Sequence, residues 1–281
     1  MDRRRFPAND RVALQGVADR APGRHAVSGQ AAQVVWPVAD LCAAPGGARD
    51  RQLLLGAAVT VIELRGDHAF VQADADGYVG YLVQEALGPV ATPTHRVITR
   101  ATHAYAAPDL KSPDRMALPM GAAVAVTGVQ NGFAATAVGH VPQGHLAPLH
   151  QPAADPVTVA ERLLGTPYLW GGNSAYGIDC SGLVQAGLAL CNLSAPGDSD
   201  MQATELGEAL DMDAPLRRGD LLFWKGHVAW VADDRRILHA NAHHMAVAFE
   251  DREQAIARIH AGGDGPVTAR RRIAEITPPR G

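Results

Sequence analysis

Short apolar runs separated by Gly, Pro, Asp and Asn fill the first 150 residues of the chain. Runs of this kind are typical of short strands joined by tight turns. They also repeat, because Ala44-Pro45 and the run 56–61 return as Ala107-Pro108 and the run 121–126. The pattern therefore predicts two small antiparallel barrels of about 55–60 residues each.

From residue 157 the hydrophobic pattern becomes helical. Apolar side chains of residues 157–164 share one helical face, and Gly165 and Pro167 end it. We expect a second helix over 180–193 and a third over 199–210, opened by a capping box at its first four residues. Strand-like runs follow at 221–224, 227–232, 237–240, 246–249 and 269–275. Helices followed by strands predict an α+β domain.

These patterns divide the chain into four parts. Residues 1–31 form an N-terminal arm, residues 32–90 and 94–149 the first and second barrels, and residues 155–281 the α+β domain. A short linker rich in Pro and Ala precedes the last part. The fold class is therefore an α+β domain preceded by two small all-β barrels.

Composition and charge fit a globular protein. Hydrophobic residues make up 47% and charged residues 19%, and the formal net charge of -4 leaves no basic footprint for nucleic acid. No apolar run reaches the roughly 18 residues of a membrane span, and no apolar stretch of the kind found in secretory signals follows the first residues. We expect a cytoplasmic protein without nucleic-acid or membrane partners. Its oligomeric state is left open.

The three cysteines do not form a disulfide pattern. Cys180 and Cys191 share a face of the predicted helix but lie about 16 Å apart along its axis, beyond disulfide reach. Cys42 and Cys191 are expected to be packing residues. Reduced thiols fit the cytoplasm.

Cys180 is the candidate nucleophile. A cysteine reacts as its thiolate, and a helix N-terminus and a nearby imidazole both lower the thiol pKa from about 8.5. Cys180 opens the predicted helix after a glycine-rich loop, and His227, at the start of a strand-like run, is the candidate base. A third group must hold the imidazole in the correct tautomer, and His239 in the next strand is the candidate.

His227 and His239 meet only if they share one face of the sheet. A regular two-residue turn at residues 234–235 would put them on opposite faces, because side chains alternate along a strand. A connection of three or five residues, or a bulge, restores the shared face. We therefore predict an odd connection or a bulge around residues 233–236.

Several motifs of the α+β domain resemble one known family. They are Tyr-Leu-Trp-Gly-Gly at 168–172, Asp-Cys-Ser-Gly-Leu-Val at 179–184, Gly-Asp-Leu at 219–221, Gly-His-Val at 226–228 and His-Ala at 239–240. In order and spacing they are similar to the NlpC-type peptidases of the papain-like group. The resemblance implies a papain-like domain with Cys180 as nucleophile, His227 as base and His239 as third residue. No cofactor is expected.

The same resemblance extends to the substrate. It places Tyr168, Asp179 and Ser181 in the substrate cleft, although Tyr168 also fits a core aromatic and Asp179 a helix N-cap. The implied reaction is hydrolysis of the bond between γ-D-glutamate and an L-diamino acid in peptidoglycan (murein) peptides. The sequence leaves open whether the diamino acid is lysine or diaminopimelate.

The barrels are similar to bacterial SH3-like modules, the first more closely than the second. Members with this layout resemble cytoplasmic enzymes that recycle murein peptides with an unblocked N-terminal L-Ala. The resemblance implies a carboxylate for that amine, which could come from Asp179 beside the nucleophile and from Asp50 in the long loop of the first barrel, and Tyr78 could close the pocket. The alternative interpretation is that the two barrel residues, Asp50 and Tyr78, only hold domains together.

Other functions stay open at this point. A thiol acyltransferase or amidase on the same scaffold also uses Cys180 and His227, whereas a non-catalytic cell-wall binding protein uses the barrels alone. The joint presence of Cys180, His227 and His239 favours an enzyme. No metal site is expected at His243-His244, because neighbours in a strand face opposite sides and no zinc-type spacing accompanies them. The three arginines at 270–272 are expected at a solvated strand edge.

Overall fold

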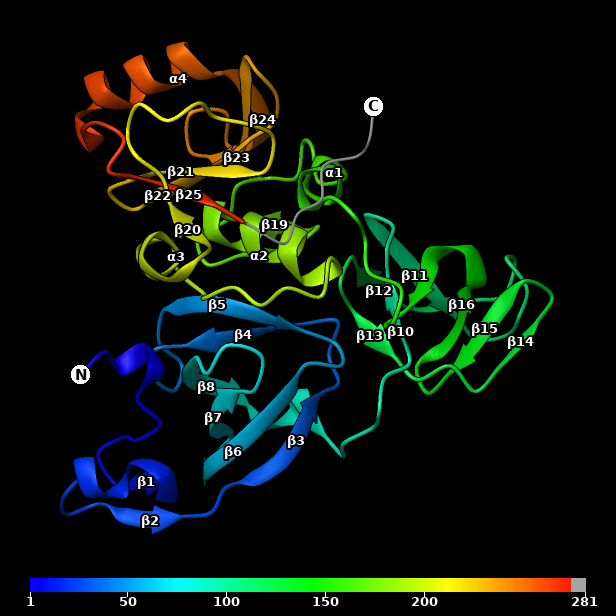
Figure 1. Ribbon diagram of the computed structural model, residues 1–281. Coiled ribbons are helices and arrows are strands. Elements are labelled where there is room, and N and C mark those ends of the chain that lie inside the picture. The colour runs from blue at the N-terminus through cyan, green and yellow to red at the C-terminus, as the bar shows by residue number, and fades with distance from the viewer. Residues whose placement is uncertain (274–281) are drawn as a thin grey trace. The chain divides into compact units, whose positions relative to one another are not determined.

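The computed structural model describes residues 1–273, and strands dominate it (Figure 1). The chain separates into two compact units, Met1–Leu149 and His150–Gly281. Because the described residues end at 273, the last predicted strand, over 269–275, lies partly outside them. Within the described part, no helix has the length and apolar character needed to cross a membrane.

The N-terminal unit begins with a short arm and a seven-stranded sheet in the order β5-β4-β8-β7-β6-β3-β9. The arm contains β1 (Val12–Leu14), β2 (His25–Val27) and the 3-10 turns η1 (Arg3–Arg5) and η2 (Gln15–Arg20). The sheet contains β3 (Gln30–Val34), β4 (Val38–Cys42), β5 (Arg49–Leu54), β6 (Ala58–Arg65), β7 (His68–Ala73), β8 (Val79–Val83) and β9 (Leu87–Gly88). Alternate side chains such as Leu41, Val71 and Leu82 meet in its core.

The second part of this unit repeats the strand order of the first. The sheets β12-β11-β16-β15-β14 and β13-β10-β17 take the places of β5-β4-β8-β7-β6 and β6-β3-β9. The strands are β10 (His95–Val97), β11 (Ala101–Tyr105), β12 (Asp114–Pro119), β13 (Ala123–Val124), β14 (Gly128–Gln130), β15 (Phe133–Thr136), β16 (Gly139–Pro142) and β17 (Leu146–Pro148). The 3-10 turns η3 (Gln84–Ala86) and η4 (Gln143–His145) also correspond. The two copies of the sequence repeat therefore have the same order of strands.

One pair of glycines shows why the two copies turn alike. Gly56 and Gly121 both adopt left-handed backbone conformations, with φ of 85° and 91°. Each donates its N–H to the carbonyl of an equivalent strand residue, Val34 or Val97, at 2.9 Å. Because only glycine adopts such a φ at little cost, the repeated Gly-Ala-Ala-Val motif marks the same turn in each copy.

The C-terminal unit packs helices against a six-stranded antiparallel sheet in the order β20-β25-β21-β22-β23-β24. Its strands are β20 (Glu208–Ala209), β21 (Asp220–Trp224), β22 (His227–Val231), β23 (Arg236–Asn241), β24 (Ala246–Asp251) and β25 (Ala269–Arg272), with a small hairpin of β18 (Asn173–Ser174) and β19 (Gly177–Ile178). Its helices are α1 (Pro156–Glu161), α2 (Cys180–Leu190), α3 (Ser199–Glu205) and α4 (Arg252–Ile259), and the π-helical turn η5 (His260–Asp264) follows α4.

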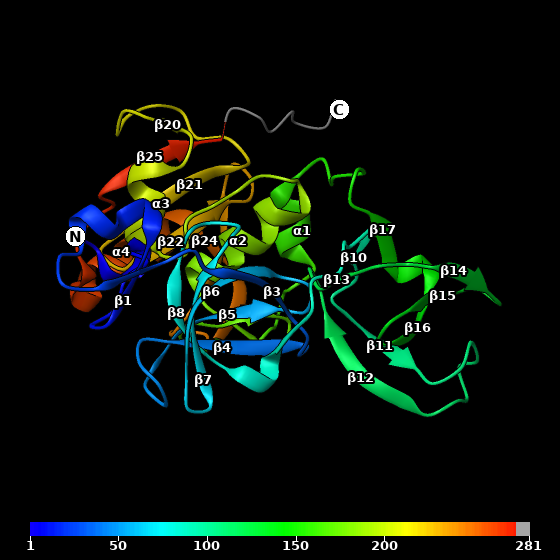
Figure 2. The same ribbon diagram turned by 90° about the horizontal axis from the view of Figure 1, so that it is seen from below.

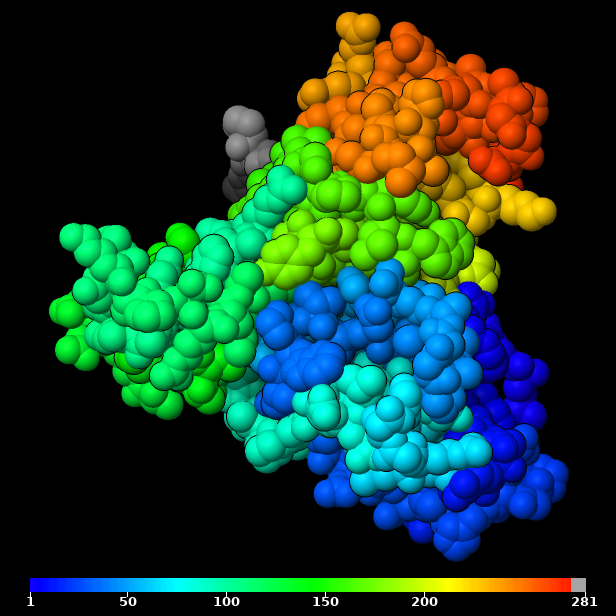
Figure 3. Space-filling view, turned by 180° about the vertical axis from the view of Figure 1, so that it is seen from behind, coloured from blue at the N-terminus to red at the C-terminus, as the bar shows by residue number. Residues whose placement is uncertain are grey.

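Two groups of helices pack against this sheet: α1 and α2 form the first, and α4 forms the second. α2 contacts β22 and β23, and α1 contacts β23. Both helices are labelled in the two ribbon views (Figure 1 and Figure 2). α4 packs Ala255 and Ile259 into a core with Leu222 and Val231 of the sheet. Other residues of α4, such as Glu253, are exposed. The helix belongs to the orange part of the chain in Figure 3. The predicted α+β order of helices and strands is present.

Two helix predictions need correction. α3 ends at Glu205 rather than near 210, because Gly207 turns with φ of 52° and Glu208 pairs with Arg272 of β25. Its N-cap is Asp198, whose side chain makes no capping hydrogen bond, so the proposed capping box is absent. α4 was not predicted at all, although Asp251 caps it by accepting the N–H of Gln254 at 3.1 Å.

The arginine run at 270–272 is not a solvated edge. β25 lies inside the sheet, between β20 and β21. Arg272 donates to both carboxylate oxygens of Asp220, which is 1% exposed, at 2.8 and 2.7 Å. A buried carboxylate needs such a partner, so this arginine is structural.

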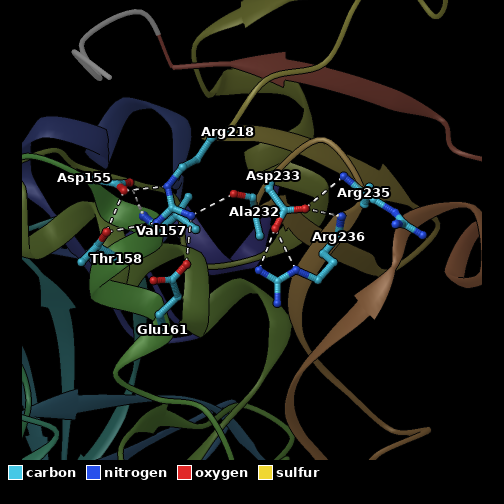
Figure 4. A network of polar contacts seen from close by, with 9 residues as sticks. All are labelled: Asp155, Val157, Thr158, Glu161, Arg218, Ala232, Asp233, Arg235 and Arg236. Carbon is cyan, nitrogen blue, oxygen red and sulfur yellow. Dashed lines mark hydrogen bonds and ion pairs between the residues drawn. The ribbon is translucent and has the colours of Figure 1, made fainter. Parts of the chain in front are cut away.

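Arg218 connects helix α1 to the sheet (Figure 4). It donates to Asp155 at 2.8 Å, to Glu161 at 2.9 Å and to the carbonyl of Ala232 at 2.8 Å. Asp155 is also the N-cap of α1 and accepts the N–H of Val157 at 2.9 Å. Burial raises the pKa of Asp155, but hydrogen bonds from Thr158, Arg218 and Val157 outweigh burial and hold that pKa below its usual value.

We expect Arg218→Met to lower the free energy of unfolding by about 2 kcal/mol, because Asp155 loses its cation while remaining buried. Arg236→Met is the matched control, since its exposed pair with Asp233 is worth about 0–1 kcal/mol (Figure 4). The pKa of Asp155 is depressed in the folded state, so its contribution is present at neutral pH and is lost as the pH falls through the folded pKa. The gap between wild type and Arg218→Met should therefore narrow below about pH 4. Urea unfolding measures both effects, and equal losses in the two variants would contradict this role of Arg218.

Candidate active site

Cys180 is the first residue of α2 and is 7% exposed. The backbone N–H groups of Val228, which follows His227, and of Ser181 lower the pKa of this thiol. The thiol therefore lies where the helix N-terminus meets the start of β22. Burial, with a smaller contribution from the Asp179 carboxylate, raises the pKa of Cys180 to about 12. At rest the sulfur is a thiol, and it becomes a thiolate only when a neighbouring base takes its proton.

The register of β22 and β23 brings the two histidines together. Trp230 pairs with Leu238 and Val231 with Ile237, so residues 233–235 form a three-residue connection. This register carries His239 to the face of the sheet that holds His227. Their Nε2 and Nδ1 atoms are 2.8 Å apart. The predicted odd connection is confirmed.

Both histidines are neutral in the resting site. His227 retains some exposure, yet burial of its ring lowers its pKa to about 3, and the nearby His239 adds to the shift. His239 is fully buried, and burial lowers its pKa as well. A neutral imidazole is the form that accepts a proton, so His227 has the protonation state that a general base requires.

Glu250 is a site residue that the sequence did not reveal. Its carboxylate is 3.1 Å from Nε2 of His239 and accepts two hydrogen bonds from Arg258 of α4. The hydrogen bond from His239, helped by Arg258, outweighs burial and holds the pKa of Glu250 well below its usual range. The strand was predicted to end at residue 249, and α4 was not expected. The sequence signal that could have revealed this helix is Asp251, which caps it by accepting the N–H of Gln254 directly after the strand.

The predicted substrate residues of this unit surround the start of α2. Asp179 is the N-cap: Oδ1 accepts from the Gly182 N–H at 2.7 Å and from Ser181 Oγ at 3.0 Å, and Oδ2 accepts from the Gly171 N–H at 2.9 Å. Asp179 therefore has the capping role that the sequence left open. Burial, with smaller contributions from Cys180 and Asp179, raises the pKa of Tyr168, so its hydroxyl stays protonated near the thiol. Substrate contacts of these residues stay predictions.

Asp50 and Tyr78 lie in the N-terminal unit. Asp50 accepts two hydrogen bonds from Arg3 of the arm, at 2.7 and 2.8 Å. Tyr78 is 2% exposed and belongs to the core of the first sheet, with the Arg51 guanidinium 5.3 Å from its ring centroid. Their roles in substrate binding stay predictions.

Three potential metal ligands lie close to the histidine pair. Atoms of His239, His244 and Glu250 come within 4.8 Å of one another. Both nitrogens of His239 and both oxygens of Glu250 already have hydrogen-bond partners, and the Arg258 cation opposes a second cation. His243 and His244 lie in the turn 242–245 with their rings edge to face, so their expected placement in a strand is wrong.

Two parts of the chain match known protein families. Residues 165–260 match the NlpC/P60 family, and residues 41–87 match the bacterial dipeptidyl-peptidase SH3 domain. A γ-D-glutamyl-L-lysine dipeptidyl-peptidase of Bacillus cereus is 36% identical over 98 residues, 32% of this chain and 29% of that protein. The protein of the same name from Bacillus subtilis is 35% identical over 96 residues, 31% of this chain and 32% of that protein. The matches thus span about a third of these curated relatives.

Solved structures share the fold. An NlpC/P60 family protein from Bacillus cereus has a TM-score of 0.72 at 20% identity, covering 86% of this chain and 99% of that one. An NlpC/P60 endopeptidase from Photobacterium damselae subsp. piscicida has a TM-score of 0.57 at 13% identity, covering 85% and 70%. The matched SH3 residues fall in the first copy of the N-terminal repeat alone. Residues 165–260 therefore form an NlpC/P60 domain, and residues 41–87 form a bacterial SH3 domain.

Proposed function

We propose that this protein is a cysteine peptidase that hydrolyses the bond between γ-D-glutamate and an L-diamino acid in free peptidoglycan peptides. The observation that carries the proposal is the array of Cys180 at a helix N-terminus beside the start of β22, with His227 hydrogen-bonded to His239. The names of the curated relatives support the substrate class.

Cys180 and His227 together supply the nucleophile and the proton transfers that the reaction requires. His227 takes the thiol proton, and the thiolate, stabilised by the N-terminus of α2, attacks the γ-glutamyl carbonyl carbon. His227 then gives its proton to the departing amine of the diamino acid. Water attacks the resulting thioester with His227 again as base, which releases the glutamyl peptide and restores the thiol. The Tyr168 hydroxyl is a hydrogen-bond donor near the reacting centre.

We further propose that the enzyme acts in the cytoplasm on cut peptides whose N-terminal L-Ala is unblocked, as expected for murein peptide recycling. Asp50 is proposed as a carboxylate for this amine and Tyr78 as a further substrate-binding residue. Because Arg3 holds both oxygens of Asp50, the ammonium group of the substrate must share or replace this partner. A buried amine without a charge partner is costly, so the site should discriminate strongly.

We expect the free tripeptide L-Ala-γ-D-Glu-L-diamino acid to be cleaved several hundredfold faster, in kcat/KM, than its N-acetylated form, from a difference of about 3–5 kcal/mol. Asp50→Asn should reduce this ratio. Asp40→Asn is the matched control, because Asp40 forms an ion pair with Arg49 in the same domain. Similar rates for the two peptides with the wild type would refute the selection, and an unchanged ratio in Asp50→Asn would remove Asp50 from it.

A further inference from the structure

The hydrogen bonds of the two histidines continue to a charged pair on the next strand and helix. Nε2 of His239 faces a Glu250 oxygen at 3.1 Å, and Arg258 donates to the two Glu250 oxygens at 2.8 and 2.7 Å. The His239 side chain is fully buried and that of Glu250 is 13% exposed. We call His227, His239, Glu250 and Arg258 the relay.

The relay fixes where the protons lie. An ionised carboxylate only accepts hydrogen bonds, so Nε2 of His239 must carry a proton. Nδ1 of the same neutral ring is then an acceptor, and Nε2 of His227, 2.8 Å away, must be the donor. Nδ1 of His227 is therefore left without a proton. It is the ring nitrogen that can take one from a thiol.

We propose that Glu250 is a positioning residue that selects the tautomer of His239 and thereby makes Nδ1 of His227 the base toward Cys180. The proposal rests on the cysteine-peptidase function above. The Glu250 carboxylate also supplies the negative charge that a neutral third histidine lacks. When His227 becomes an imidazolium, its positive charge is connected through His239 to a partly buried carboxylate, which stabilises it.

The charges around the relay act in known directions. For His227, burial and the nearby His239 and Arg258 lower the pKa, whereas Glu250 raises it. For His239, burial, Arg258 and His244 lower the pKa, and Glu250 again raises it. Glu250 is thus the acidic group that opposes burial at both rings. Removing its charge lowers the pKa of the His227 imidazolium, so the cation formed during the reaction is less stable and His227 stays neutral down to a lower pH.

Glu250→Gln removes the charge while keeping the size of the side chain, and its amide can donate to His239 and invert the tautomers. We expect kcat to fall about 100-fold with little change in KM, and the acidic limb of the kcat profile to move to lower pH. Glu250→Asp, which keeps the charge, should recover part of the rate. Glu253→Gln is the matched control, because Glu253 is exposed and pairs with Arg252.

Nitrogen-15 NMR of the histidine rings tests the relay without substrate, and so separates it from the proposed function. In the wild type near pH 7, we expect both His227 and His239 to carry their proton on Nε2. A wild-type His227 protonated on Nδ1 would overturn the proposal even if Glu250→Gln does not fold. A folded Glu250→Gln with wild-type tautomers, kcat and pH profile would overturn it as well. Wild-type protein with the expected tautomers but no hydrolysis would refute the proposed function alone.

Discussion

Replacement of Cys180 by alanine is expected to reduce kcat/KM about ten-thousandfold or more and to leave the fold intact. The reaction needs the sulfur as nucleophile, and no second thiol opens α2. The variant keeps the cap of this helix, because Asp179 bonds the backbone N–H of Gly182 and the side chain of Ser181 rather than the thiol. Circular dichroism and thermal unfolding should therefore match the wild type.

The other cysteines supply the control for this prediction. Cys42→Ala and Cys191→Ala should retain activity, and iodoacetamide should label Cys180 first. Burial raises the pKa of Cys42, as it does that of Cys180, but of the three cysteines only Cys180 is the first residue of a helix. If Cys42 or Cys191 reacts first and Cys180→Ala still hydrolyses the peptide, the assignment of the nucleophile is wrong.

Substitution of His227 by glutamine should lower kcat about a thousandfold. The glutamine amide can still donate to Nδ1 of His239, but it cannot take and return a proton. Because burial holds the pKa of His227 near 3, its cation forms at neutral pH only through transfer from the thiol. The alkylation rate of Cys180 should therefore fall together with kcat.

His243→Gln is the matched control for this substitution, since His243 lies in an exposed turn of the same unit. It should change neither the alkylation rate nor kcat by more than about twofold. Rapid alkylation of Cys180 in His227→Gln, at the wild-type rate, would show that another group activates the thiol.

The sequence predicted those parts of the site that depend on local pattern. A glycine-rich loop followed by helical spacing placed Cys180 at a helix start, and the odd connection at 233–235 followed from requiring two histidines on one face. Glu250 could not be found in this way. Its role depends on the pairing of β23 with β24 and on Arg258 from a helix that was not expected.

Tertiary context also explains the failed predictions. The helical pattern of residues 199–210 is cut short because Glu208 pairs with Arg272, a partner far away in sequence. The same pairing places the arginine run at 270–272 inside the sheet rather than at its edge. The pattern of a single sequence indicates which residues favour helix or strand, but it does not show which strands pair. Pairings between residues far apart in sequence can therefore not be predicted from it.

Product analysis of the free tripeptide tests the central claim most directly. Wild-type protein should convert L-Ala-γ-D-Glu-L-Lys, or its diaminopimelate counterpart, into L-Ala-D-Glu and the free diamino acid, as read by mass spectrometry. Cys180→Ala, at the same concentration, should leave the peptide intact. Cleavage of a different bond, or the same products from Cys180→Ala at the wild-type rate, would contradict the account.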